Sequence, residues 1–318
     1  MTWKTQSFVA VFRMFLMDNF KFEHNVSLKN FCTFKIGGSA KFLYIAKDIN
    51  SLIGACSYAN AHNIKYKIIG LGANLLFDDL GYNGLIIVNK SNRILFRNVR
   101  GSFDCAQDDP SCSVYVDSGV NITNLIIKCC LRSLCGFENL AGIPSTIGGA
   151  VVNSLGAFNT NFSDNIEYVE CYHKSDLTKK LRLNHDDCLF GYRSSIFKNN
   201  GYIITRIKLK LKQDNKQLIQ QRIKEAIEKK TSAQPLSLPS AGSIFKRSSI
   251  IPAKAIDDLG LKGTKIGDAQ ISTKHAGFIV NTHSATSKDV KKLITLIQEK
   301  VKATYNTNLD PEIEFVEY

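Results

Sequence analysis

The sequence contains no apolar run long enough to cross a bilayer. Its longest apolar stretches, such as residues 85–88 and 124–130, fall far short of the roughly 20 apolar residues that a membrane-spanning helix needs. No secretion signal is expected either, because Arg13 interrupts the short apolar run near the N-terminus and no small-residue cleavage site follows. We therefore expect no membrane span and interpret residues 1–24 as an N-terminal extension.

Paired cysteines are also absent. The nine cysteines are an odd number, and none is spaced Cys-x-x-Cys, so neither a disulfide framework nor a structural zinc site is indicated. This pattern favours a reducing compartment. We expect a cytoplasmic protein that holds no metal.

Aromatic-rich nucleic-acid modules such as an RNP1-like string are missing, and the lysines are spread along the whole chain. Yet 41 Lys and Arg against 28 Asp and Glu give a formal net charge of +13, and such a field attracts anions. Nucleic acid and polyanionic small molecules both satisfy this attraction. Without a basic arm, we expect a small-molecule partner and no nucleic acid.

The chain of 318 residues, 44% of them hydrophobic, is long enough for two or three domains. Residues 40–90 predict strand, helix, strand and strand, which is an α/β pattern. A second unit begins with a strand at Val114, continues with an apolar helix over residues 121–134, and becomes β-rich towards residue 211. Between the units, the polar stretch at about 97–113 has neither period and indicates an inserted surface loop.

The C-terminal third predicts two helices and a last strand. Residues 215–230 form a polar amphipathic pattern that leads into another domain. Thr286 and Asp289 form a capping-box pattern, and the helix that follows should pack one apolar face. Its apolar positions are Val290, Leu293, Ile294, Ile297 and Val301. The final residues, IEFVEY, read as a strand.

Two glycine-rich loops could approach a phosphate closely. GLGANLLF, at 70–77, follows an apolar strand, but Leu75 stands where GxGxxG would need its third glycine, and no Gly-Lys-Ser/Thr of a P-loop follows. A plain glycine turn between strands is an equally good interpretation of this loop alone. GIPSTIGGA, at 142–150, adds a rigid turn and hydroxyl donors, so together the loops suggest a dinucleotide held between two small α/β units.

Six motifs occur in the order typical of UDP-N-acetylenolpyruvoylglucosamine reductases, which the chain resembles over nearly its whole length. They are GLGANLL, GIPSTIGGA, GYRSSIF at 191–197, PSAGSIFK at 239–246, KIGDAQISTKHAGFIVN at 265–281, and LDPEIEF at 309–315. The fifty residues from Arg193 to Ser243 resemble the shorter subclass of that family.

The resemblance implies an α+β fold, with a split FAD-binding region of the vanillyl-alcohol-oxidase (PCMH) type followed by an α/β substrate-binding domain. The expected boundaries are 25–212 for the FAD-binding region in two subdomains, 213–308 for the substrate-binding domain, and 309–318 for a C-terminal strand. The implied activity is reduction of the enolpyruvyl group of UDP-N-acetylglucosamine-enolpyruvate to UDP-N-acetylmuramate, in peptidoglycan precursor synthesis. The implied cofactors are bound FAD and NADPH as hydride donor, and we expect a monomer acting on a nucleotide sugar.

The resemblance also assigns site residues. Those expected to bind the cofactor are Gly70, Gly72, Ala73, Asn74, Leu75, Gly142, Ile143, Pro144, Ser145, Thr146, Gly148 and Gly149. Ser243 is the implied proton donor, Arg193 the partner of the substrate carboxylate, and Glu312 the catalytic glutamate. Without the family, a serine in a turn, a surface salt bridge and an ordinary strand carboxylate would be the preferred interpretations of these three.

Other residues in these motifs stay open. Glu314 shares the strand face of Glu312, so period alone does not choose between them. His275 is left outside the catalytic set, because a lone histidine is more often structural. For Lys246 and Arg247, two interpretations are equally good: they hold a uridine diphosphate, or they form a solvated basic edge.

The sequence departs from the family pattern at a few positions. Ser154 stands where the family has asparagine, with Asn153 one residue early, and Ser145 replaces a common glycine. Asp117 is an acid where small residues are usual. Two alternative functions remain: another flavin oxidoreductase of the same fold, or a non-enzymatic nucleotide-sugar or nucleic-acid binder.

Overall fold

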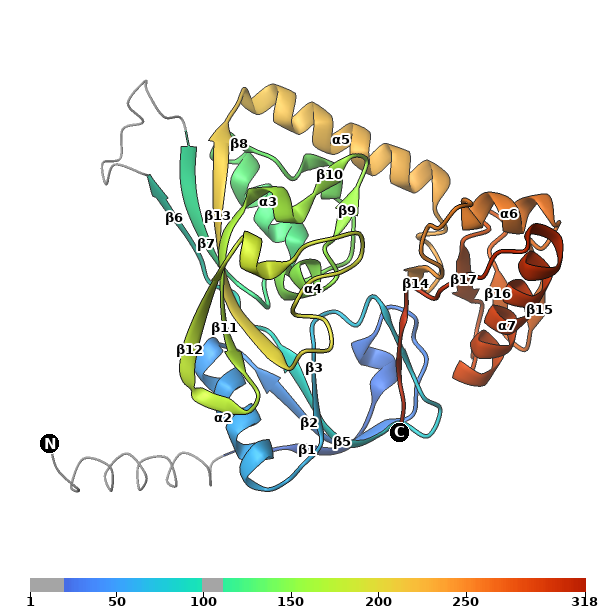
Figure 1. Ribbon diagram of the computed structural model, residues 1–318, viewed down its shortest axis with the longest axis horizontal. Coiled ribbons are helices and arrows are strands. Elements are labelled where there is room, and N and C mark those ends of the chain that lie inside the picture. Colours follow the sequence, from blue (N-terminus) through green and yellow to red (C-terminus); the bar gives the residue numbers. More distant parts are fainter. Residues whose placement is uncertain (1–19, 99–110) are drawn as a thin grey trace, which may run out of the picture.

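Three groups of strands and helices make up the part of the chain that the computed structural model describes, residues 20–98 and 111–318 (Figure 1). Residues 1–19 of the expected N-terminal extension (1–24) lie outside the described residues. Its last residues pack on the first group. The ring of Phe20 lies 5.1 Å from that of Tyr44, and the ring of Phe22 lies 5.0 Å from that of Tyr58, measured between centroids.

The first group is a four-stranded sheet in the order β1-β2-β5-β3. Strands β2 and β3 both run parallel to β5, and β1 closes the edge in antiparallel orientation. Side chains of β5 alternate between two apolar cores, Ile86 with Val88 on one face and Leu85 with Ile87 on the other, which explains its unbroken apolar run. The elements are β1 (Glu23–Ser27), η1 (Leu28–Phe31), β2 (Ser39–Ala46), α2 (Ile49–Ala61), β3 (Tyr66–Ile69), β4 (Leu75–Phe77) and β5 (Tyr82–Asn89).

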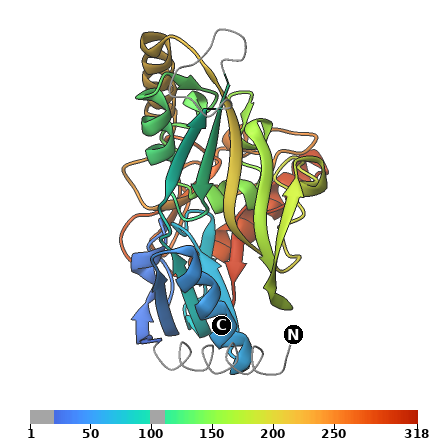
Figure 2. The same cartoon turned by 90° about the vertical axis from the view of Figure 1, so that its left-hand side faces the viewer.

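The second group is an antiparallel sheet in the order β12-β11-β13-β7-β6, with β8 also paired to β13 (Figure 2). Helices α3 and α4 bury their apolar residues in one core with strands β7, β11 and β13. The elements are β6 (Ile94–Asn98), β7 (Ser111–Asp117), α3 (Ile122–Cys130), β8 (Leu134–Cys135), η2 (Glu138–Leu140), α4 (Ile147–Val152), β9 (Gly156–Ala157), β10 (Thr160–Asn161), η3 (Phe162–Asn165), β11 (Ile166–His173), β12 (Asp176–Asn184), η4 (Asp186–Cys188) and β13 (Tyr202–Gln213).

The expected inserted loop at 97–113 is shorter than predicted at both ends. Arg97 pairs with Ser113 and Asn98 with Cys112 in the β6–β7 ladder, so the edges of the stretch belong to strands. The prediction was wrong there because ladder hydrogen bonds to a neighbouring strand can order a segment that has no hydrophobic period of its own. Residues 99–110 lie outside the described part of the chain.

Asp117 ends β7 and ties three strands together. Its carboxylate accepts hydrogen bonds from Arg206 Nε on β13 at 3.0 Å and from the amide of Arg93 at 3.2 Å. The side chain is 6% exposed, so this pairing is what allows a buried charge at this position. The acid that departs from the family pattern thus joins the β6–β7 hairpin to the sheet.

The third group is a small sheet in the order β14-β17-β16-β15, reached through the long helix α5 (Figure 1). The predicted capping box of α7 is confirmed, since Thr286 and Asp289 exchange hydrogen bonds of 3.1 and 3.0 Å. All five of its predicted core positions are buried. The elements are α5 (Lys216–Ala233), β14 (Ser240–Ser243), α6 (Pro252–Asp258), β15 (Lys265–Ile266), β16 (Ala269–Ile271), β17 (Phe278–Asn281), α7 (Ser287–Tyr305) and β18 (Glu314–Val316).

The last strand leaves the third group and returns to the first. β18 pairs in parallel with β4, and the apolar side chains of the first and third groups form one continuous core that includes Phe34, Phe77, Ile256 and Leu293. The two groups are therefore packed together and not merely linked by α5. Within the described residues, no helix is both long and apolar enough to span a membrane.

Candidate active site

One cavity of about 1380 Å³ opens where the three groups meet. Pockets for single small molecules are roughly 300–1,000 Å³, so this one has room for more than one ligand. Every residue that the sequence analysis selected lines it. These are Gly70, Gly72, Ala73, Asn74, Leu75, Gly142, Ile143, Pro144, Ser145, Thr146, Gly148, Gly149, Arg193, Ser243 and Glu312.

The first glycine loop follows β3 directly and presents free backbone amides. Gly72 has φ +62°, and a Cβ there would lie 2.2 Å from the carbonyl oxygen of Phe31, so only glycine fits this crowded turn. In the described part of the chain, the amides of Leu71, Gly72 and Ala73 donate to no protein acceptor. A run of unpaired amides on a cavity wall suits the phosphates of a dinucleotide.

The second glycine loop lies against the first. Thr146 caps α4 by accepting a hydrogen bond from the amide of Gly149 at 3.3 Å. A Cβ on Gly70 would lie 2.3 Å from Thr146 Oγ1, so the two loops approach each other as closely as their atoms permit. The two glycine loops therefore lie side by side in one site.

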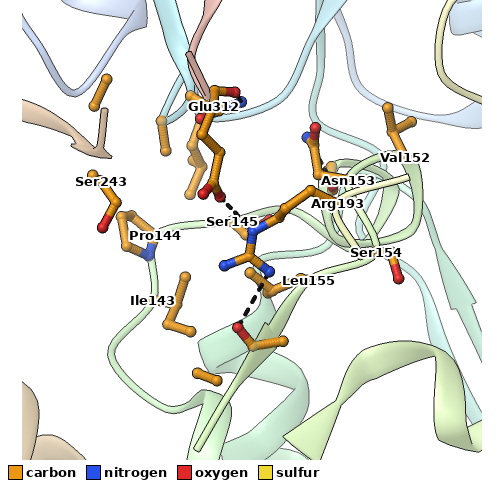
Figure 3. Close-up of a pocket in the computed structure, with 18 of the residues that line it drawn as sticks. Ile143, Pro144, Ser145, Val152, Asn153, Ser154, Leu155, Arg193, Ser243 and Glu312 are labelled. Carbon is orange, nitrogen blue, oxygen red and sulfur yellow. Dashed lines mark hydrogen bonds and ion pairs between the residues drawn. The ribbon is translucent and has the colours of Figure 1, made fainter. Parts of the chain in front are cut away.

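Arg193 projects from a tight turn in the second group of strands and helices. The backbones of Gly191 and Ser194 exchange two hydrogen bonds, of 3.0 and 3.2 Å, and Arg193 has φ +54° between them. Its Nε forms an ion pair with Glu312, and one terminal nitrogen donates to the carbonyl of Gly156 at 3.3 Å (Figure 3). Both charged side chains are about one fifth exposed.

Glu312 is held by its backbone on two sides. Its amide donates to the carbonyl of Ile244 at 2.7 Å, and its own carbonyl accepts from Asn74 Nδ2 at 3.0 Å. Glu314 points elsewhere and pairs with Lys67 Nζ at 2.5 Å. The two glutamates, which strand period did not distinguish, therefore differ in their partners: Glu312 precedes β18 and meets Arg193, whereas Glu314 lies within the strand and meets Lys67.

Ser243 ends β14 opposite Phe278 of β17. Its side chain is exposed to the cavity, and Figure 3 shows Ser243, Glu312 and Arg193 facing a common space. The three residues come from the third group, the C-terminal segment and the second group respectively. A hydroxyl, a carboxylate and a guanidinium are therefore assembled from distant parts of the chain.

Lys230 is a cavity residue that the sequence analysis missed. It lies on α5, and its Nζ donates to the carbonyls of Asn139 and Ala141 at 2.5 and 2.8 Å. Burial lowers the pKa of this lysine to about 8. The signal was present in the sequence, since Lys230 follows Ile219 and Ala226 at helical spacing and so belongs to the buried face of the helix.

The lining of the cavity carries more positive than negative groups. The cations are Lys67, Arg193, Lys229, Lys230 and Arg247, and the acids are Asp164, Glu312 and Glu314. Of the residues left open, Arg247 and His275 line the cavity, and burial lowers the pKa of His275. The positive excess attracts anionic ligands into the cavity.

The departures near α4 have a conformational explanation. Ser154 is buried with φ +42°, a region where asparagine is several times more common than other non-glycine residues. Asn153 ends α4, and its side-chain amide donates to the carbonyl of Gly149 at 3.3 Å. The backbone thus keeps the turn that asparagine would favour, with serine in its place.

Known proteins match this chain along its length. Residues 234–316 match the family model described as the C-terminal domain of UDP-N-acetylenolpyruvoylglucosamine reductase, and residues 40–176 match one described as an FAD binding domain. A UDP-N-acetylenolpyruvoylglucosamine reductase of Thermotoga sp. (strain RQ2) is 39% identical over 282 residues, 88% of each chain. One of Clostridium kluyveri (strain NBRC 12016) is 35% identical over 291 residues, 91% of each chain.

A solved structure is similar over the same length. The crystal structure of the UDP-N-acetylenolpyruvylglucosamine reductase of Thermus caldophilus superposes with a TM-score of 0.75 at 31% identity, covering 93% of this chain and 98% of that one. The resemblance inferred from the six motifs is confirmed, as are the α+β fold and the FAD-binding region.

The contact between the glycine loops predicts a loss of flavin when it is disturbed. In Gly70→Ala, the new methyl group would force Thr146 away, and we expect FAD affinity to fall at least about tenfold, or about 1.4 kcal/mol. Thr146→Ala in the same chain removes the clashing atoms and should restore part of the affinity. Flavin absorbance per protein after gel filtration, and a fluorescence titration of the apoprotein, measure the change.

Gly191→Ala is the matched control, because its Cβ would meet only Ser194 Cβ at 3.9 Å in the same cavity. It should keep its flavin. Wild-type affinity in Gly70→Ala would contradict the close approach of the loops.

Proposed function

The chain belongs to the UDP-N-acetylenolpyruvoylglucosamine reductase family, and we propose that Arg193, Ser243 and Glu312 carry out its reaction on the enolpyruvyl sugar nucleotide. The chain is a flavin-dependent oxidoreductase that forms UDP-N-acetylmuramate for peptidoglycan, with FAD bound and NADPH as reductant. The observation that carries the proposal is the Arg193–Glu312 ion pair facing Ser243 beside two glycine loops in one cavity.

The free amides of the 70–74 loop and the hydroxyl-bearing 142–149 loop fit FAD, and we propose that these loops hold it. FAD, when bound, supplies the hydride that NADPH provides. The protein must then hold the substrate carboxylate, bear the charge that develops on it, and protonate the neighbouring carbon. Each of these tasks falls to a different side chain of the cavity.

Arg193 is the proposed partner of the substrate carboxylate. Glu312 occupies its Nε and Gly156 one terminal nitrogen, while among the described residues its other terminal nitrogen has no partner. That free donor can meet a substrate oxygen as negative charge grows on it. Because the guanidinium is already oriented by the ion pair, little reorganisation accompanies the step. The negative charge of Glu312 also offsets the positive charge of Arg193, which limits the net charge beside the substrate carboxylate.

Ser243 is the proposed proton donor to the carbon next to the new C–H bond. A serine hydroxyl is a weak acid in water, so it serves only beside a strongly basic, enolate-like carbon in a site sheltered from solvent. Its position at the end of β14, on a strand paired with β17, gives the hydroxyl a rigid support. After the product leaves, Ser243 takes up a proton from solvent to replace the one that it donated.

We also infer the domain division 25–212, 213–308 and 309–318, with the FAD-binding region in two subdomains. The inference is supported by the three larger sheets of the described residues and by the linking position of α5. A cytoplasmic monomer that binds no nucleic acid is the proposed state. The positive excess along the cavity wall suits a nucleotide sugar, and the eight cysteines within the described residues are free thiols.

Anaerobic spectroscopy tests the function. Purified protein should show the flavin spectrum, lose it on addition of NADPH, and regain it when UDP-N-acetylglucosamine-enolpyruvate is added. Ser243→Ala should be bleached by NADPH like wild type, yet reoxidise at least about 100-fold more slowly, the usual share of acid catalysis. The exposed Ser249→Ala serves as control. Reoxidation by other electron acceptors alone would favour a different flavin enzyme of this fold.

The two glutamates offer a matched pair. Glu312→Gln keeps the shape but loses the charge that orients Arg193, and we expect kcat to fall about 100-fold. Glu314→Gln disturbs only a partly exposed pair with Lys67, and its kcat should stay within about threefold. Steady-state rates at saturating substrate decide between them, and equal losses in both variants would overturn the assignment of Glu312.

Lys230 predicts a pH effect on substrate binding. Its pKa, lowered to about 8 by burial, means that the ammonium is charged below pH 8 and neutral above it. Attraction for the sugar nucleotide should therefore be full near pH 7 and weaken as the pH rises towards 9, seen as an increase in KM. Lys230→Met should raise KM at pH 7 and abolish this step. Lys229→Met, at the exposed neighbouring position, should retain it.

A further inference from the structure

The turn that carries Arg193 has a conformation that its sequence does not favour. Gly191, Tyr192, Arg193 and Ser194 form a two-residue turn, and Arg193 occupies its second central position with φ +54°. Turns with a positive φ at that position normally have glycine or asparagine there. An arginine held in this region is strained, and such strain persists only where surrounding contacts impose it.

Lys198 supplies one of those contacts. Its Nζ donates a hydrogen bond to the backbone carbonyl of Arg193 at 3.3 Å. The base of the lysine is fixed in turn, because its amide donates to the carbonyl of Ser195 at 3.2 Å, and Ser195 Oγ donates to the carbonyl of Val152 on α4 at 2.8 Å. The ammonium thus reaches back across the turn from an anchored segment.

The charge of Lys198 is costly where it stands. Its side chain is half-buried, and among the described residues it forms no ion pair within 4 Å. Burial and the nearby charges of Lys246 and Arg193 lower its pKa, although Glu314 and Glu312 act in the opposite direction. The hydrogen bond to the Arg193 carbonyl links this partly buried charge directly to the turn.

We propose that Lys198 is a positioning residue for the reduction step. By its hydrogen bond to the Arg193 carbonyl, it holds the turn in the left-handed conformation that directs the guanidinium towards Glu312 and towards the substrate carboxylate. The inference rests on the proposed function, since it assigns Lys198 a role only through Arg193. Lys198 does not line the cavity and contacts no substrate in this account.

The two half-reactions separate this role from a structural one. In Lys198→Met, bleaching of the flavin by NADPH should stay within about twofold of wild type. Reoxidation by UDP-N-acetylglucosamine-enolpyruvate should slow about 10- to 100-fold, because a misplacement of about 1 Å at a catalytic group can cost that much. The loss should fall on kcat more than on KM. Lys198→Arg, which can still donate to the carbonyl, should recover most of the rate.

Coupling to Arg193 provides a second measurement. Reoxidation in Arg193→Lys with Lys198→Met should be about as slow as in Arg193→Lys alone, since the turn no longer presents the guanidinium. Lys300→Met, on the exposed face of α7, is the control and should behave as wild type.

Three results would overturn the inference. The first is reoxidation of Lys198→Met at the wild-type rate. The second is that Lys198→Met and Lys198→Arg lose flavin content and the rates of both half-reactions to the same extent. The third is that the losses caused by Arg193→Lys and Lys198→Met add fully in the double variant. If wild type itself is not reoxidised by the sugar nucleotide, the proposed function fails and the role of Lys198 falls with it. If wild type is reoxidised and only the Lys198 results fail, the function stands without this role.

Discussion

The return of the C-terminal segment to the first group of strands is the constraint on which the site depends. Residues 311–316 make backbone hydrogen bonds to the third group through Ile244, and to the first group through Asn74 and β4. One short segment therefore fixes the distance between the first glycine loop and the serine-bearing strand. Glu312, near the start of this segment, reaches the second group through its pair with Arg193. All three groups are therefore hydrogen-bonded to this one residue, two of them through its backbone and one through its carboxylate.

Crowded backbone at the loops gives the cavity its rigidity. Gly70 lets the two glycine loops touch, and Gly72 lets the first loop pass against the carbonyl of Phe31. Elsewhere on the cavity wall, Arg193 and Ser154 occupy left-handed conformations that their side chains do not favour. Local backbone preference is thus overridden at several positions of the cavity wall, where tertiary contacts impose the conformation.

The positive charge of the chain is partly gathered at the cavity, which the composition alone does not show. The formal charge of +13 indicated anionic partners in general, whereas the lining of the cavity has five lysines and arginines and three acids, of which Glu312 and Glu314 are ion-paired. Lys230 shows the compromise most clearly. Two backbone carbonyls hold its ammonium in a buried position, and burial brings its pKa close to the physiological range. A buried cation of this kind attracts phosphate more strongly than an exposed one, because the medium around it screens less.

The sequence by itself determined the helices and strands with strong periodicity, the capping box of α7, the family, and the cofactor. It also indicated the candidate site residues, because the six motifs are short segments that occur in the same order as in the family. Only the tertiary structure paired Glu312 with Arg193 and Glu314 with Lys67, placed Lys230 on the cavity wall, showed the contact of Lys198, extended β6 and β7 into the predicted loop, and explained Asp117 through its bond to Arg206. The physical reason is that each of these depends on contacts between residues far apart in sequence, or on a backbone conformation that no periodic pattern encodes. The hydrophobic period of a sequence describes one helix or strand at a time, whereas the site forms where three groups of strands and helices meet.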